Sequence, residues 1–325
     1  MTKPSTASAI AHPNIAFIKY WGVRDATLHL PENGSISMNL GALETRVSVT
    51  FDSHLEQDEL EINQQVVLGE RFQRITAFMD VIRKIAHKHT HAHVESENKF
   101  PMAAGLASSA SAFAALALAG SKAIGLELNE LSLSRLARRG SGSACRSIPS
   151  GFVEWKAGTS DKSSFGTSIA GPEHWDLVDC IALVKTSEKT ISSREGHSLA
   201  QTSPLQSSRV KDAPRRLEIC RNSILHKDFD SLATISELDS LWMHAVMMTS
   251  TPALMYWEPA TIQVVKAIAK ARQGGLSAFT TIDAGPNVHV ITTKSNLDET
   301  VAILQTLPGV IRVIASSTGE GARLV

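Results

Sequence analysis

The chain has few cysteines, no net charge and no long apolar run. Its three cysteines, Cys145, Cys180 and Cys220, are widely separated among 325 residues, so they form no metal-type pair and cannot all be bridged. This pattern indicates packing residues in a reducing compartment, and we expect a cytoplasmic protein. Lys plus Arg (32) balances Asp plus Glu (32), so there is no overall basic field for nucleic acid or an anionic membrane. No segment approaches the roughly 20 apolar residues of a membrane span.

The sequence also lacks two common phosphate-binding motifs, the Gly-Lys-Ser/Thr end of a P-loop and the Gly-x-Gly-x-x-Gly of dinucleotide folds. It does have 43% hydrophobic residues, enough for a substantial core in one large or two closely packed lobes. Hydrophobic periodicity predicts mixed elements without an internal repeat. We expect strands at 46–51, 61–68, 91–99, 277–282, 288–292 and 310–314, and helices at 71–86, 109–124, 210–226, 229–248, 259–272 and 296–307.

A run of small residues at 101–110 connects an expected strand to a long alanine-rich helix. Small residues let backbone N–H groups approach an anion closely, and the positive end of the following helix favours negative charge there. The hydroxyls of Ser108 and Ser109 can add hydrogen bonds or a Mg²⁺ ligand. Taken alone, however, the run fits a tight packing turn better than a phosphate site.

Three further stretches concentrate polar groups. The segment 14–22 carries Lys19 among apolar residues, which on its own indicates a strand with a solvent-facing lysine. The Gly/Ser loop at 138–147 contains three arginines and can bind phosphate, although a flexible turn with surface arginines explains it equally well. Ser192-Ser193-Arg194 by itself is a polar loop.

Asp283 follows the strand expected at 277–282 and precedes a Gly-Pro turn. Asp at a strand end before Gly-Pro is commonly turn chemistry. A carboxylate fixed on a tight turn is also what a general base requires, because its geometry must be held near the proton that it removes. Only the other motifs favour the second interpretation.

Together, these stretches resemble the mevalonate diphosphate decarboxylase family of the GHMP kinase superfamily. The matching motifs follow the family's order over most of the chain, and they are Asn14-Ile-Ala-Phe-Ile-Lys-Tyr-Trp-Gly22, Pro101-Met-Ala-Ala-Gly-Leu-Ala-Ser-Ser-Ala110, Gly140-Ser-Gly-Ser-Ala-Cys-Arg146, Gly151-Phe-Val-Glu-Trp155, Ser192-Ser-Arg194 and Asp283-Ala-Gly-Pro-Asn287. The resemblance implies a two-lobed α+β GHMP kinase-like fold with mixed and antiparallel sheets flanked by helices. We expect one lobe at 1–185 with the ATP phosphate loop and one at 186–325 with the catalytic Asp.

The resemblance also implies ATP and Mg²⁺ as cofactors, and a mevalonate ester that is phosphorylated at its 3-hydroxyl before it loses phosphate and CO₂. Asp283 would orient and deprotonate that hydroxyl, and Arg146 would hold the substrate near its carboxylate. Positioning and charge neutralisation are the main work of phosphoryl transfer. The ATP side would comprise Pro101, Ala104, Gly105, Leu106, Ser108 and Ser109, with the two serines as Mg²⁺ ligands. The substrate would be held by Asn14, Lys19, Tyr20, Ser141, Gly142, Ser143, Ser193 and Arg194.

One position beside the substrate's outer phosphate departs from the family pattern. The family usually has Lys-Tyr-Trp-Gly-Lys-Arg-Asp, whereas this chain has Val23 in place of the second lysine. Losing that cation removes a charge-assisted contact with phosphate. We therefore expect 5-phosphomevalonate as the substrate and isopentenyl phosphate as the product. If Arg24 or another cation compensates, the substrate is diphosphomevalonate and the product is isopentenyl diphosphate.

Two other functional classes fit the same fold. A mevalonate-type 3-kinase would stop after phosphorylation, and a non-catalytic sensor would lack the base or the phosphate loop. The presence of both Asp283 and Arg146 favours the full decarboxylation. Relatives in the family are often homodimers, so we expect a homodimer acting on a small molecule, with no nucleic-acid or membrane partner.

Two features remain outside this scheme. The tract at 87–93 has four histidines at alternating positions, which on a strand would share a face. No carboxylate or thiolate partner is evident, so we interpret the tract as a surface strand edge, with adventitious Zn²⁺ or Ni²⁺ binding as the alternative. Leu241 occupies a position where relatives tend to have Asn, in a helix that can face the site.

Overall fold

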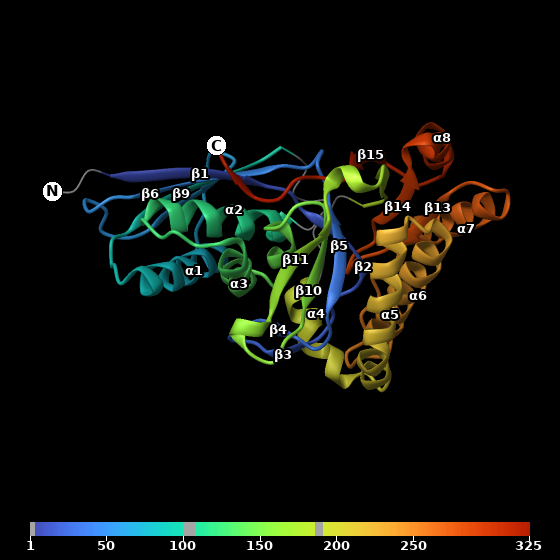
Figure 1. Ribbon diagram of the computed structural model, residues 1–325, viewed down its shortest axis with the longest axis horizontal. Helices are drawn as coiled ribbons and strands as arrows, with labels where there is room; N and C mark the ends of the chain where they lie inside the picture. The colour runs from blue at the N-terminus through green and yellow to red at the C-terminus, as the bar shows by residue number, and fades with distance from the viewer. Residues whose placement is uncertain (1–3, 100–107, 186–190) are drawn as a thin grey trace.

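The computed structural model describes residues 4–99, 108–185 and 191–325. Over these ranges it has three larger sheets and a two-stranded one, with helices packed around them (Figure 1). One sheet is mixed, because β7 runs parallel to β9, and the other strand pairings are antiparallel. The expected α+β class with mixed and antiparallel sheets flanked by helices is confirmed.

The first sheet lies at the N-terminal end of the molecule. Its strands in spatial order are β16 (Arg323–Leu324), β1 (Ser5–Ala11), β6 (Thr45–Phe51), β9 (Ala92–Asn98), β7 (Glu59–Ile62) and β8 (Gln65–Val66). Alternate residues of β6 are buried, and they pack with α1 (Glu70–Ala86), α2 (Ser108–Ala123) and α3 (Glu130–Gly140) on one face (Figure 1). The alanines of α2 allow this helix to approach the sheet closely.

The strand expected at 61–68 is instead a hairpin of β7 and β8. Asn63 and Gln64 have φ of 49° and 64°, so the chain turns back after Ile62. Asn adopts this left-handed conformation more readily than most residues. The turn residues therefore override the β-propensity of the segment.

The second and third sheets share a core. The second sheet contains β11 (Phe165–Ala170), β10 (Phe152–Lys156), β5 (Ser35–Asn39) and β2 (Asn14–Ile18), and the third contains β13 (Ala278–Thr281), β14 (Val288–Thr293), β12 (Leu177–Leu183) and β15 (Arg312–Ser317). Phe17 of β2 and Phe279 of β13 have ring centroids 6.3 Å apart in one apolar cluster. A short ribbon, β3 (Val23–Asp25) with β4 (Leu30–Pro31), follows β2.

The lobe boundary expected at residue 185 stays a prediction. The pairing of β12 with β14 and β15 places a strand from before this boundary inside the third sheet. Conversely, β16 from the end of the chain pairs with β1. The strand pairing thus crosses residue 185 in both directions.

Helices of the second half pack beside the second and third sheets (Figure 1). They are α4 (Ser193–Leu199), α5 (Gln206–His226), α6 (Phe229–Met248), α7 (Pro259–Gln273) and α8 (Leu297–Thr306). The α6 bounds equal the expected ones, because Asp228 caps its first turn by accepting from the Ser231 N–H. The start of α4 is fixed by a capping box of Ser192 and Glu195.

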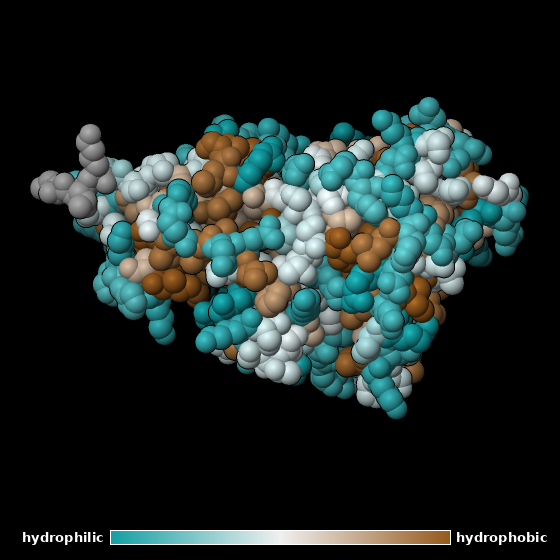
Figure 2. All heavy atoms as spheres, viewed as in Figure 1, coloured by the Kyte–Doolittle hydropathy of each residue, from teal (hydrophilic) through white to brown (hydrophobic). Residues whose placement is uncertain are grey.

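On the face seen in Figure 2, apolar residues form separate patches between hydrophilic ones. No helix of the described ranges is long and apolar enough to cross a membrane.

Candidate functional site

Residues from most of the sequence motifs line one cavity of about 340 Å³. This volume lies within the usual range of small-molecule sites. The described residues that line it are Ala16, Lys19, Tyr20, Trp21, Val23, His29, Arg74, Ser109, Ser141, Gly142, Ser143, Arg146, Ser192, Ser193, Arg194, His197, Met243, Asp283 and Ala284.

The buried Lys19 and the half-buried Asp283 form an ion pair at this cavity. Lys19 follows β2, Asp283 follows β13, and the distance from Lys19 Nζ to Asp283 Oδ1 is 2.6 Å. The solvent-facing lysine that the segment alone suggests is therefore wrong, since Lys19 is buried. Burial alone would raise the pKa of Asp283, but the Lys19 ammonium, with His289 and Arg146 nearby, lowers this pKa to about 2. Asp283 is thus ionised at neutral pH.

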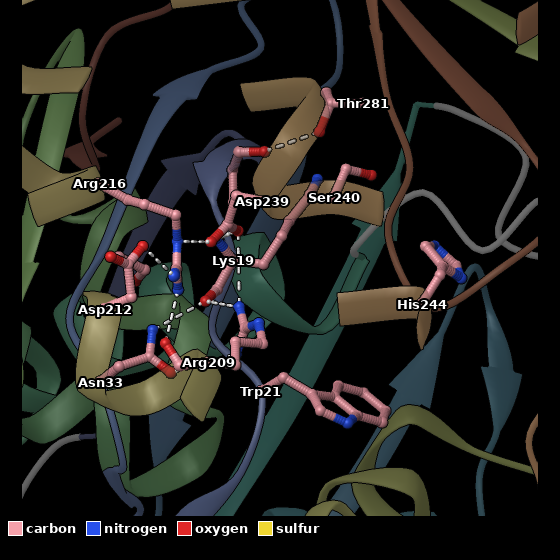
Figure 3. Close-up of polar contacts among 12 residues, drawn as sticks. Lys19, Trp21, Asn33, Arg209, Asp212, Arg216, Asp239, Ser240, His244 and Thr281 are labelled. Carbon is pink, nitrogen blue, oxygen red and sulfur yellow. Dashed lines mark hydrogen bonds and ion pairs between the residues drawn. The ribbon is translucent and has the colours of Figure 1, made fainter. Parts of the chain in front are cut away.

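The backbone of Lys19 is held by a buried polar cluster (Figure 3). Asp239 Oδ2 on α6 accepts from the Lys19 N–H at 2.6 Å, while Arg209 on α5 donates to the Lys19 carbonyl at 2.9 Å. Arg216 donates to Asp239 Oδ1 at 2.7 Å. Sequence reasoning missed this cluster, although the spacing of Arg209 and Arg216 indicates one helix face. Leu241, two residues after Asp239, is 51% exposed and is not among the cavity residues.

Arg146 is a buried cation held by neutral oxygens. Its guanidinium donates to Asn14 Oδ1 at 3.0 Å, to Ser37 Oγ at 3.0 Å and to Ser35 Oγ. Among the described residues it has no carboxylate partner within salt-bridge distance. Burial lowers the pKa of Arg146, and the nearby Asp283 carboxylate opposes this shift without forming an ion pair with it. Asn14 is not among the cavity residues, and its side-chain oxygen accepts from Arg146, so its contact with the substrate stays a prediction.

The Gly/Ser loop forms a short 3₁₀ helix, Gly142–Ser147, directly after α3. A Cβ on Gly142 would lie 2.8 Å from the Tyr20 ring, so glycine lets the loop and this ring meet. The three arginines near the loop do not converge. Arg138 is paired with Asp161 at 2.6 Å, outside the cavity lining, whereas Arg146 lines it.

The ATP-side residues are only partly within the described ranges. Pro101, Ala104, Gly105 and Leu106 lie outside them, as does the side chain of Ser108. The next hydroxyl, Ser109 Oγ, lies 3.3 Å from Ser141 Oγ in the cavity, so the two predicted sides of the site adjoin there.

Arg74 on α1 is a cavity residue that sequence reasoning missed. It donates to the Gly140 carbonyl at 2.8 Å, and its guanidinium carbon lies 4.5 Å from the Phe113 ring centroid. Burial and the nearby Arg194 lower its pKa to about 10. The residue lies 120 positions from Arg194 in the sequence, and no local motif marks it.

The cavity carries an excess of positive charge. Among the described lining residues, four are cationic, Lys19, Arg74, Arg146 and Arg194, and one is a carboxylate, Asp283. Hydroxyls of the serines at 109, 141, 143, 192 and 193 lie between them. This donor set fits a ligand with several negative charges.

The histidine tract lies away from this cavity and is not a strand edge throughout. His87 caps α1 in a left-handed conformation, and β9 starts only at Ala92. The structure brings a carboxylate next to the tract that sequence analysis did not identify. His93 Nδ1 lies 3.1 Å from Glu59 Oε2. Among the described residues, no group of three or more His, Cys, Asp or Glu side chains is arranged to hold a metal ion.

Comparison with known proteins agrees with this arrangement. Residues 11–166 match the family model of the diphosphomevalonate decarboxylase-like N-terminal domain, and residues 180–320 match that of the mevalonate 5-diphosphate decarboxylase C-terminal domain. The chain belongs to the mevalonate diphosphate decarboxylase family. The resemblance expected from the motifs is thereby confirmed.

Individual members of this decarboxylase family cover nearly the whole chain. The diphosphomevalonate decarboxylase of Candida albicans is 34% identical, with 97% of both chains covered. The phosphomevalonate decarboxylase of Haloferax volcanii is 32% identical, with 90% of both chains covered. A solved structure described as MDDEF in complex with MVAPP, AMPPCP and magnesium is 37% identical, covers 99% of both chains and has a TM-score of 0.94.

Proposed function

We propose that the protein is an ATP-dependent decarboxylase of a mevalonate 5-phosphoester. The ionised Asp283, held by Lys19 at 2.6 Å in the cavity that Arg146 also lines, carries this proposal. The excess of cationic groups around this carboxylate supports a multiply charged anion as the ligand.

In the proposed reaction, Asp283 orients the substrate's 3-hydroxyl and accepts its proton as the oxygen bonds to the γ-phosphorus of ATP, releasing ADP. The C–O bond to the new phosphate then breaks, and the bond between the carboxyl carbon and its neighbour supplies the electrons of the alkene. Phosphate and CO₂ leave. Arg146 binds the substrate carboxylate and stabilises the developing charge.

ATP and Mg²⁺ are the proposed cofactors. Among the described residues, Arg74 and the Ser109 hydroxyl have a chemistry that fits the nucleotide's phosphates, and the nucleotide would supply the transferred phosphoryl group when bound. The AMPPCP and magnesium in the related structure support this assignment. The Ser108 and Ser109 roles as metal ligands stay proposals.

The comparisons favour diphosphomevalonate as the substrate, in place of the 5-phosphomevalonate expected from Val23. Both family models and the Candida albicans relative are named for the diphosphate. The second candidate is 5-phosphomevalonate, because Val23 lines the cavity and adds no positive charge there. The Haloferax volcanii relative supports this candidate.

The test is an assay with ATP and Mg²⁺ in which the two esters are offered separately and both ADP and CO₂ are recorded. Higher kcat/KM for the diphosphate supports the first candidate, and higher kcat/KM for the monophosphate supports the second. Release of ADP without CO₂ indicates a 3-kinase. If neither ADP nor CO₂ is released, the proposed function is contradicted. In the Val23→Lys variant, we expect kcat/KM for the diphosphate to rise about tenfold relative to the monophosphate.

We also propose the lobes at 1–185 and 186–325 and a homodimer. Light scattering of the purified chain tests the dimer, and a mass of one chain, 35.0 kDa, contradicts it.

A further inference from the structure

His197 is a cavity residue to which neither the sequence motifs nor the proposed reaction gives a role. It lies on α4 four residues after Ser193, so the two side chains share one face of the helix, and both line the cavity. The imidazole stacks on the Tyr20 ring with centroids 4.1 Å apart, and the Trp21 ring centroid is 4.5 Å away. Two aromatic neighbours therefore fix the ring in place.

The hydrogen bonding of His197 sets its tautomer. Its Nδ1 accepts from the backbone N–H of Gly22 at 3.1 Å, because a backbone N–H can only donate. A neutral imidazole whose Nδ1 accepts carries its proton on Nε2. Tyr20, Trp21 and Gly22 occupy the ring face and the Nδ1 side. Nε2 has no hydrogen-bond partner among the described residues, so its proton is available to a ligand in the cavity that His197 lines.

His197 is also uncharged. Burial lowers its pKa, and His29, Arg209 and Arg146 lower it further, to about 3. The ring therefore offers a donor without adding a positive charge to the cavity.

The neighbours of His197 indicate which end of a ligand it meets. Asp283, Lys19 and Arg146 form one group in the cavity, suited to a hydroxyl and a carboxylate. His197 shares α4 with Ser193 and Arg194, stacks on Tyr20, and accepts a hydrogen bond from Gly22, the residue before Val23. Hydroxyl, guanidinium and neutral N–H donors together suit a phosphoryl group.

We propose that His197 is a substrate-binding residue that donates an Nε2 hydrogen bond to the 5-phosphoryl group of the ester. This inference rests on the proposed function. A neutral donor recognises the phosphoryl oxygen by geometry, so it serves a monophosphate and a diphosphate alike. Val23 and His197 add no positive charge to the cavity, whereas Arg194 is a cation on the same helix as His197.

Two variants distinguish the contribution of the Nε2 hydrogen bond from that of the aromatic stacking. His197→Phe keeps the aromatic stacking and loses both nitrogens, whereas His197→Gln places an amide nitrogen near the position of Nε2. For His197→Phe we expect KM for the preferred ester to rise about ten- to a hundredfold, with kcat and KM for ATP changed less than about threefold. His197→Gln restores KM to within about fivefold of the wild-type value.

A second readout needs no turnover. In ¹⁵N spectra of the wild-type protein, His197 shows a protonated Nε2 and an unprotonated Nδ1, and the Nε2–H signal shifts when the ester is added without nucleotide. Calorimetric Kd values for the ester should follow the KM values of the two variants. Thermal unfolding of each variant checks that the fold is kept.

Three results overturn the inference while the wild-type protein turns over an ester: unchanged KM and Kd in His197→Phe, no recovery in His197→Gln, or a proton on Nδ1. If the wild-type protein turns over neither ester, the proposed function fails instead. The inference is then decided by the ¹⁵N titration alone, and an unshifted Nε2–H signal with both esters overturns it.

Discussion

Two buried cations, Lys19 and Arg146, have different surroundings in the candidate site. Lys19 is neutralised by Asp283 at 2.6 Å, whereas Arg146 meets amide and hydroxyl oxygens. An isolated buried charge is costly unless it is paired. Arg146 is therefore held ready for an anion, and Lys19 serves to keep Asp283 ionised.

Lys19→Met should change the pH dependence of the reaction. In the wild type the pKa of Asp283 is about 2, so this carboxylate stays ionised above about pH 4 and contributes no acid limb in the neutral range. Without the ammonium, burial raises that pKa, and the base becomes protonated as pH falls. We expect the acid limb of kcat/KM to move upward to about pH 5 or above. If the pH profiles of kcat/KM for the wild type and Lys19→Met superimpose from pH 5 to 9 after scaling, this role of Lys19 is contradicted.

Arg146→Gln should separate activity from stability. We expect kcat to fall at least about a hundredfold, because the substrate carboxylate and developing charge lose their cation. The midpoint of thermal unfolding should change by less than about 3 °C, since removing an unpaired buried charge offsets the lost hydrogen bonds. Calorimetry and steady-state kinetics on the same preparation measure both. A large fall in the midpoint would mean that Arg146 is mainly structural.

Motifs predicted the residues that are close in sequence to a turn or a small-residue loop. Asp283, Arg146 and the loop residues at 141–143 all line the cavity as expected. The partners of Lys19 were not predicted, because Asp239 is 220 positions away and Asp283 is 264 positions away. Contacts over such distances depend on the pairing of sheets and helices, which local patterns do not encode.

At the scale of elements, α5 and α6 fix the end of β2 through the cluster around Asp239 (Figure 3). Asp239 is fully buried, and it contacts Arg209 and Arg216, which are buried as well. Removing one partner of a buried ion pair leaves charge uncompensated in a medium of low polarity. The cluster should therefore matter to both folding and the placement of Lys19.

Asp239→Ala should lower the free energy of unfolding by about 3–5 kcal/mol. The reason is that the buried Arg209 loses its carboxylate partner and the buried Arg216 keeps only Asp212 among the described residues. Leu241→Ala on the same helix is the matched control, with a change within about 0.5 kcal/mol at this exposed position. Urea denaturation of both variants measures the difference. Equal stability of the two variants would show that the cluster contributes little.

Element prediction succeeded where periodicity and caps agreed. The α6 helix was predicted with its observed bounds, since its apolar pattern starts at the Asp228 cap. By contrast, α4 lies in a polar stretch of seven residues, too short for a periodic signal. Its capping box, Ser192 with Glu195, is the local signal that would have found it.

At the scale of the whole molecule, the second and third sheets are joined by one apolar core. This core takes Phe17 and Ile36 from the second sheet, and Ile181 and Phe279 from the third. The C-terminal β16 also pairs with β1 and forms one edge of the first sheet. The fold class was predicted from the expected strands and helices and from the motifs. The sharing of strands across residue 185 was not predicted, because it depends on long-range pairing.

The shared core predicts a single cooperative unfolding transition. We expect calorimetric and van't Hoff enthalpies to agree, since one apolar core takes residues from both sides of residue 185 and strand pairing crosses that residue in both directions. Differential scanning calorimetry at two scan rates measures this. Two resolved transitions would instead support lobes that fold independently at 1–185 and 186–325.

The most direct test of the central claim is the stoichiometry of ADP and CO₂ released from the preferred ester with ATP and Mg²⁺. The account predicts equal amounts of both products from the wild-type chain. It predicts loss of both products together in Asp283→Asn, because the carboxylate acts before either is released. ADP without CO₂ from the wild type, or near-normal release of both from a folded Asp283→Asn, would contradict it.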